Sequence, residues 1–197
     1  SAAPQLDANL QHLRTLGHYQ PAMLHYAGEW YWGIDRLPYL AERLQALGVA
    51  RAAHDFVLND APLPGEKGQA PTTFLISDPA DLACLRALHL PLDFYFSFRS
   101  PYSYLALSRV IALAEHYGLD LRFRPVLPMV MRGLPVPREK RLYILLDAAR
   151  EAERLGIPFG RVCDPVGTGV ERCMALFPAA AAAGRADAYL RHVAEGI

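Results

Sequence analysis

The chain has 197 residues, of which 52% are hydrophobic, and its 20 basic and 20 acidic side chains give a formal net charge of zero. This length and hydrophobic content are enough for one sizeable globular domain or two small ones. Because the basic residues are scattered among acidic ones, the sequence indicates no positively charged face, so we expect no nucleic-acid partner.

The sequence also predicts a cytoplasmic protein without membrane contact. No apolar run reaches the roughly 20 residues that span a bilayer, and the first ten residues lack a basic and then apolar leader. The three cysteines form neither a CxxC nor a zinc pattern, and we interpret them as reduced, mostly buried thiols: Cys84, Cys163 and Cys173. The seven histidines are dispersed and indicate no metal site.

The N-terminal part of the sequence predicts a helix, a hairpin and a second helix. Leucines at helical spacing predict the first helix over residues 5–16. Residues 18–33 are typical of two strands joined by the turn Ala27-Gly28. A second apolar helical stripe follows, and we expect Asp35 to cap its start and Gly48 to end it.

The middle of the chain, residues 49–90, is less regular and is interpreted as a connector. Within it, TTFLIS predicts a short strand at 72–77. The stretch DPADLACLRAL predicts a short helix at 78–88, with Pro79 at its first position.

The pattern becomes sharper in the last half of the chain. A strand at 92–98, a helix at 101–117 and a strand at 119–126 predict a βαβ unit, whose crossover makes the two strands parallel. The remainder is predicted to be helical. One helix ends at Gly156 and carries the apolar stripe Leu142, Leu145, Leu146 and Ala149, and an alanine-rich segment from Val170 predicts one or two more.

The junction between the first of these strands and its helix resembles a known family. FYFSFRSPYSYLAL at 94–107 and EKRLYILLDAAREAERLGIPF at 139–159 resemble the 2-hydroxychromene-2-carboxylate isomerase family. That family belongs with the kappa-class glutathione transferases among the DsbA-like thioredoxin folds. The resemblance implies an α/β, thioredoxin-like fold with a helical insertion.

The order of the elements is unusual for this fold. Residues 17–44 are similar to the family's closing segment, so closing elements occupy 1–48, a connector 49–90, and opening elements 91–197. Either the chain is cut from a tandem protein, or the two pieces complete one domain. Completion would occur within one chain or by exchange between the chains of a homodimer.

The motif Ser100-Pro101-Tyr102-Ser103 matches the isomerase version of a motif that is CPHC in the disulfide enzymes. A helix N-terminus stabilises an anion, and Ser100 there would donate a hydrogen bond to the sulfur of glutathione, the expected cosubstrate. Serines at both cysteine positions cannot cycle through a disulfide. The alternative is that Ser100 only caps a helix that begins at Pro101.

The neighbouring residues leave two interpretations open. Tyr102 either lines a substrate pocket or shields the helix start, and Ser103 is expected to bond locally. Arg99 departs from the smaller or apolar residue expected before the serine. It either attracts an anionic carboxylate or is an ordinary surface arginine.

The resemblance implies further contacts in the N-terminal part. The family proline that matches Pro21 is cis, and the residue before it, here Gln20, pairs with the glutathione peptide as an added strand. A trans proline in a plain loop is the alternative. Asp35 and Arg36 correspond to the site near the γ-glutamyl end of glutathione.

One residue and one short stretch in the second half of the chain complete the comparison with the family. Lys140 matches a basic position that meets an acidic substrate, unless it is simply exposed to solvent. Residues 164–169 replace the polar start of a later helix in the family, so no glutathione contact is expected there.

These features predict a glutathione-dependent isomerase or transferase for a small aromatic or carboxylic-acid substrate. The glutathione sulfur would add to the substrate, allow rotation about the loosened bond and leave again. One alternative is a non-catalytic binding or assembly module of the same fold, which the departures at Arg99 and 164–169 favour. The other is a thiol-disulfide oxidoreductase that uses one of the three cysteines.

Overall fold

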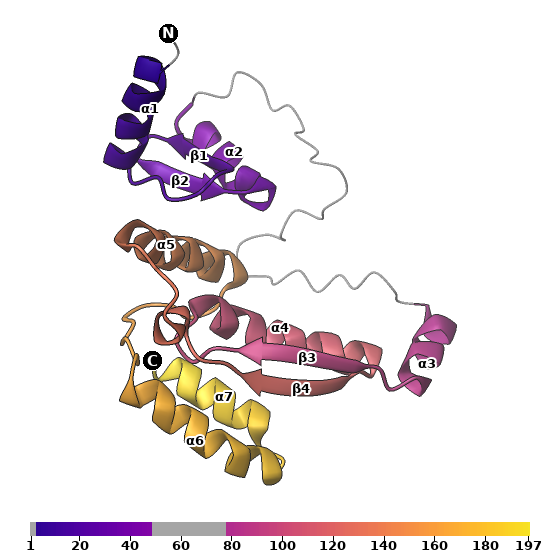
Figure 1. Cartoon of the computed structure of the whole chain (residues 1–197). Coiled ribbons are helices and arrows are strands. Elements are labelled where there is room, and N and C mark those ends of the chain that lie inside the picture. Colours follow the sequence, from indigo (N-terminus) through magenta and orange to yellow (C-terminus); the bar gives the residue numbers. More distant parts are fainter. Residues whose placement is uncertain (1–2, 49–77) are drawn as a thin grey trace. The chain divides into compact units, whose positions relative to one another are not determined.

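A computed structural model describes residues 3–48 and 78–197 (Figure 1). The chain divides into two compact units. The first contains residues 3–48 together with Pro137–Tyr143, and the second contains residues 78–136 together with Ile144–Ile197. The predicted strand at 72–77 lies outside the described residues.

The first unit has the predicted order of helix, hairpin and helix. Its elements are α1 (Ala3–Thr15), β1 (Met23–Tyr26), β2 (Glu29–Trp32), the short 3-10 helix η1 (Ile34–Arg36) and α2 (Leu37–Ala46). The strands are antiparallel, with Met23 opposite Trp32 and Tyr26 opposite Glu29. The hairpin is tied to the end of α1, because the indole N–H of Trp30 donates to the carbonyl of Leu16 at 2.8 Å.

The turn of the hairpin is the predicted Ala27-Gly28 pair. Both residues have positive φ, 48° at Ala27 and 84° at Gly28. Positive φ at both central positions defines a type I′ turn, whose twist matches the twist of the flanking strands. Alanine adopts this conformation at a cost, whereas glycine does so freely.

The predicted cap of α2 is wrong. The chain enters α2 through η1, so the N-cap position falls on Arg36, and no side chain caps the helix there. The carboxylate of Asp35 instead accepts a hydrogen bond from the Arg36 guanidinium at 2.8 Å. A local capping pattern in the sequence did not reveal this extra turn.

The second unit begins with the predicted short helix, α3 (Pro79–Ala87). Asp78 caps it, because its carboxylate accepts from the backbone N–H of Ala80 at 2.8 Å. At the other end, the Arg86 guanidinium donates to the carbonyl of His116, which holds α3 against the end of the next helix.

The predicted βαβ unit follows. β3 (Pro91–Phe96), α4 (Pro101–Tyr117) and β4 (Asp120–Pro125) form it, and the strands are parallel with Pro91 opposite Asp120 (Figure 1). α4 ends where predicted, because Gly118 takes the left-handed conformation with φ 64°. The expected crossover is therefore confirmed.

Side chains of this small sheet alternate between a buried apolar face and an exposed face. Phe94, Phe96, Leu121 and Phe123 belong to the main hydrophobic cluster. The exposed positions between them are Tyr95 and three charged residues, Asp93, Arg122 and Arg124. The Arg124 guanidinium pairs with Asp93 across the strands at 2.9 Å.

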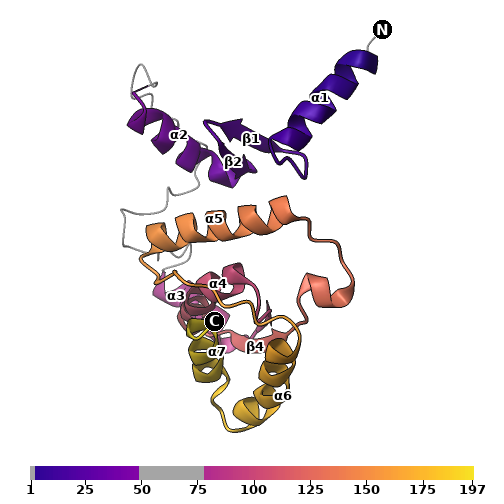
Figure 2. The same ribbon diagram turned by 90° about the vertical axis from the view of Figure 1, so that its left-hand side faces the viewer.

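Two C-terminal helices complete the core of the second unit. α6 (Thr168–Ala182) and α7 (Ala186–Glu195) lie side by side (Figures 1 and 2). They contribute Val170 and Leu190, both fully buried, to a cluster that also contains Leu107 and Ile111 of α4. The apolar face of the sheet is thereby covered.

The predicted helix that ends at Gly156 is present, but its apolar stripe is not its buried side. A 3-10 turn, η2 (Met129–Arg132), precedes this helix, α5 (Arg138–Leu155). Its predicted leucine stripe is exposed, with Leu146 at 67%. The buried side is formed instead by small residues, Ala148 and Ala152, which pack with Leu105 of α4. Small side chains allow two helices to approach closely, and a leucine stripe would not.

We predict that the turn of the hairpin limits the stability of the first unit. Ala27→Asn should raise its free energy of unfolding by about 1 kcal/mol, because asparagine tolerates the left-handed conformation better than alanine. Both tryptophans of the chain, Trp30 and Trp32, lie in β2, so their fluorescence during thermal unfolding reports on the hairpin.

The matched variant is Gly28→Ala, which forces a second alanine into positive φ. It should lower the midpoint of the same fluorescence transition. A Gly28→Ala protein that unfolds at the temperature of the wild type would contradict the turn type.

Candidate active site at the start of helix α4

The candidate site lies where β3 passes into α4. β3 ends in buried aromatic rings, Phe96 and then Phe98 beyond the strand, whose centroids are 5.3 Å apart. A tight turn follows, in which the Ser100 N–H donates to the carbonyl of Ser97 at 3.0 Å. The helix then begins at Pro101, whose fixed φ suits the first helical position. The carboxyl end of a strand and the amino end of a helix thus meet at Ser100.

Three serines close this turn by a cycle of hydrogen bonds. Besides the bond from Ser100 to Ser97, the Ser97 N–H donates to Ser103 Oγ at 3.3 Å. The Ser103 N–H donates in turn to Ser100 Oγ at 3.2 Å. Ser103 therefore bonds locally, as expected, and Ser100 is the N-cap of α4.

Ser100 can still donate a hydrogen bond while it caps α4. Its oxygen accepts the Ser103 N–H, and among the described residues no acceptor takes the hydrogen of its own hydroxyl group. Its side chain is at a half-buried position. A hydroxyl group can accept and donate at the same time, so capping and donation to a ligand are compatible.

Tyr102 reaches from the first turn of α4 to α5. Its hydroxyl donates to Asp147 Oδ2 at 2.7 Å. Asp147 is 1% exposed, and its other oxygen lies 3.4 Å from Nη1 of Arg150. Sequence reasoning missed Asp147 because it followed the leucine stripe of this helix, whereas Ala148, Ala152 and Leu155 lie on the buried side with Asp147.

The two departures from the family pattern are partners in one ion pair. Arg99 Nε and Nη2 donate to the two carboxylate oxygens of Asp164, both at 2.7 Å. The hydrogen bond to Asp164 raises the pKa of Arg99, with a smaller contribution from the attraction of the carboxylate charge. Asp164 also accepts from the Val166 N–H, so this pair fixes the following loop beside the start of α4.

The remaining predicted contacts lie in the first unit. These are Gln20, Pro21, Asp35, Arg36 and Lys140. The implied cis bond at Pro21 is wrong, because no peptide bond among the described residues is cis. A trans bond is the lower-energy isomer, and the chain turns into β1 through the positive φ of 61° at Ala22 instead.

Two of these side chains have informative surroundings. The amide nitrogen of Gln20 is buried and has no hydrogen-bond partner within the described part of the chain. Asp35 is exposed and paired with Arg36, whose side chain is only 17% exposed. Lys140 lies in the first turn of α5 at a half-buried position rather than a fully exposed one.

The cysteines are free, but the expectation that they are mostly buried is wrong. Cys84 and Cys163 are exposed, and Cys173 is half-buried in the main cluster. Burial raises the pKa of the Cys173 thiol, which disfavours its reactive thiolate form at neutral pH.

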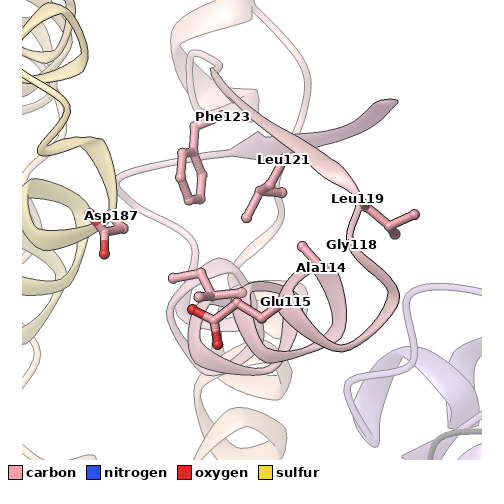
Figure 3. Close-up of a pocket in the computed structure, with 8 residues that line it drawn as sticks. Ala114, Glu115, Gly118, Leu119, Leu121, Phe123 and Asp187 are labelled. Carbon is pink, nitrogen blue, oxygen red and sulfur yellow. The ribbon is translucent and has the colours of Figure 1, made fainter. Parts of the chain in front are cut away.

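A hollow of about 460 Å³ lies at the opposite end of α4 from Ser100. Figure 3 shows Leu121 and Phe123 of β4 beside this end of α4, with the carboxylates of Glu115 and Asp187 nearby. The 17 residues of α4 correspond to about 25 Å, so the hollow is remote from the serine motif.

The described ranges, 3–48 and 78–197, contain no group of three histidine, cysteine or acidic side chains placed to hold a metal ion. None of their helices is long and apolar enough to cross a bilayer.

Comparison with known proteins bears on the second half of the chain. The model of the DSBA-like thioredoxin domain matches residues 91–197, more than half of the 197 residues. Two similar curated proteins are named 2-hydroxychromene-2-carboxylate isomerase. The protein from Pseudomonas putida is 39% identical over 74 residues, which cover 34% of this chain and 36% of the relative.

The second relative, from Pseudomonas sp. (strain C18), is 35% identical over 85 residues, which cover 39% of this chain and 40% of the relative. The chain thus spans about two fifths of the length of the curated relatives it matches. No solved structure matches it at a significant level.

The family match and the geometry agree on the architecture. The matched residues begin at β3 and contain the parallel βαβ unit with the serine motif at its strand-to-helix turn. The expected α/β, thioredoxin-like fold and the resemblance to the isomerases are confirmed. This chain belongs to the family of DSBA-like thioredoxin-domain proteins.

Proposed function

We propose that this chain carries the thiol-activating site of a glutathione-dependent isomerase or transferase for a small aromatic or carboxylic-acid substrate. The main supporting observation is Ser100, which caps α4 while no described acceptor takes its hydroxyl hydrogen. The names of the two matched relatives support the same reaction class.

The task of the site is to hold a sulfur atom as an anion. A free thiol has a pKa of about 8.5, so most of it is protonated at neutral pH. The start of α4 carries the positive end of the helix dipole, which favours a negative charge beside it. The Ser100 hydroxyl adds a hydrogen bond to that charge.

In this proposal the sulfur comes from a cosubstrate, because the motif at the start of α4 offers two serines and no cysteine. When bound, glutathione supplies the thiolate nucleophile for addition to a conjugated substrate and subsequent elimination. Pro101 sets the first turn of the helix and Ser103 holds it to the end of β3. Tyr102 forms the wall of the site toward α5.

The resemblance to the isomerase family implies further glutathione and substrate contacts, at residues of the first unit. Gln20 and Pro21 would meet the glutathione peptide, with which the backbone groups of Gln20 would pair as an added strand. Asp35 and Arg36 would meet its γ-glutamyl end. Lys140 would meet the acidic group of the substrate.

Removing the Ser100 hydroxyl should weaken glutathione binding. A hydrogen bond to a charged group contributes about 1.5–3 kcal/mol, so Ser100→Gly should bind glutathione roughly ten- to a hundredfold more weakly. Glycine is chosen because it caps a helix almost as well as serine. Isothermal titration calorimetry measures the difference.

Two controls separate the hydroxyl from general damage. Ser108→Ala removes an exposed hydroxyl from the same helix and should bind like the wild type. S-Methylglutathione cannot form a thiolate, so its affinity should not depend on Ser100. If the folded wild-type chain binds no glutathione at all, the non-catalytic module is the better interpretation.

The bound thiol should also be more acidic than the free one. We expect its pKa to fall below the free value of about 8.5, because the helix terminus and Ser100 both favour the anion. A pH titration of the ultraviolet absorbance of the thiolate, with the chain in excess, measures this pKa. Ser100→Gly should shift it back toward the free value, and an unchanged pKa would contradict the assigned role.

A further inference from the structure

Asp147 is a buried carboxylate on the side of α5 that packs against α4. It is 1% exposed and is followed directly by Ala148, a member of the cluster with Leu105 and Ala152. Moving a carboxylate out of water costs several kcal/mol unless hydrogen bonds or an opposite charge compensate for it. Because a buried charged group is weak evidence for net stability, its role is judged from the groups that it holds.

The partners of Asp147 show what it holds. Tyr102 donates its hydroxyl to one carboxylate oxygen at 2.7 Å, a short, charge-assisted hydrogen bond. Arg150, one turn later on α5, places a guanidinium nitrogen 3.4 Å from the other oxygen. The tyrosine ring is therefore fixed between the start of α4 and α5.

The hydrogen bond between Tyr102 and Asp147 also determines which hydroxyl group at the start of α4 can donate to a ligand. A phenol has a single hydrogen, and Tyr102 gives it to Asp147. It cannot give the same hydrogen to a bound sulfur. Ser100, two residues earlier, is the hydroxyl that can donate, and Tyr102 presents its ring.

We propose that Asp147 is a positioning residue, which holds the Tyr102 ring at the start of α4 and thereby sets the affinity of the site for aromatic conjugates. The second part of this proposal rests on the proposed function, whereas the link between Asp147 and Tyr102 does not. An aromatic ring held in place offers an edge or a face to an aromatic ligand without losing further side-chain freedom on binding.

The neighbouring tyrosine provides a matched control. Tyr104 lies on the same turn of α4, but its hydroxyl donates to the backbone carbonyl of Pro158 at 2.9 Å. It packs against the same small cluster as Tyr102. Tyr104→Phe therefore removes the same chemical group as Tyr102→Phe but leaves the hydrogen bond between Tyr102 and Asp147 in place.

The first arm of the experiment observes the tyrosine directly. NMR spectra of the full chain with ring-labelled tyrosine are recorded for the wild type, Asp147→Asn and Tyr104→Phe, with Tyr102→Phe to assign the signals. We expect Asp147→Asn to shift and broaden the Tyr102 ring signals and Tyr104→Phe to leave them in place. Unchanged Tyr102 signals in Asp147→Asn would overturn the proposal.

The second arm measures affinities for glutathione and S-benzylglutathione by calorimetry. Tyr102→Phe and Asp147→Asn should each weaken binding of the benzyl conjugate about tenfold, which corresponds to about 1.4 kcal/mol. The double variant should bind no more weakly than Tyr102→Phe, because Asp147→Asn only replaces the charged acceptor by a neutral one and Tyr102→Phe removes the donor of the same hydrogen bond. Glutathione itself should lose less affinity.

The outcomes separate the two proposals. Wild-type affinity for the benzyl conjugate in both single variants, or fully additive losses, would overturn the positioning role while the proposed function stands. Absence of binding of either ligand to the wild type would refute the proposed function and with it the effect on affinity, and the NMR arm would then decide the link between Asp147 and Tyr102. If Asp147→Asn does not fold, Tyr102→Phe alone decides the calorimetric arm by its selective loss of the benzyl conjugate.

Discussion

The candidate site depends on the cycle of hydrogen bonds among three serines at the end of β3. Each bond in the cycle satisfies a backbone N–H that the turn or the first turn of α4 would leave without a partner: those of Ser97, Ser100 and Ser103. In all three bonds a backbone N–H donates and a serine oxygen accepts. The hydroxyl hydrogen of Ser100 is not used in the cycle, so the same hydroxyl group can cap the helix and donate to a thiolate.

The first turn of α4 is held from two directions. On one side, Tyr102 bonds to Asp147 of α5, which approaches closely because small alanines face α4. On the other side, Arg99 pairs with Asp164 through two hydrogen bonds. The residues that depart from the family pattern thus compensate each other, since a guanidinium at one position meets a carboxylate at the other. These restraints keep the donor of a hydrogen bond in a defined direction, as preorganised sites require.

The sheet of the second unit is smaller than parallel sheets usually are. Parallel strands normally have both faces covered, and a two-stranded sheet has little stability of its own. Here one face packs into the core, while the other carries Asp93 and Arg124 at half-exposed or exposed positions.

The sequence by itself determined what depends on neighbours along the chain. The hairpin turn at Ala27-Gly28, the start of α3 at Pro79, the serine at the start of α4 and the parallel βαβ unit all follow from local φ preferences and periodicity. Only the tertiary structure decided which side of α5 is buried, and it brought Asp147 to Tyr102 and Arg99 to Asp164. Helical periodicity marks an apolar stripe but not the surface against which it packs. A buried polar residue such as Asp147 is recognisable only when the group that satisfies it, 45 residues away, is in place.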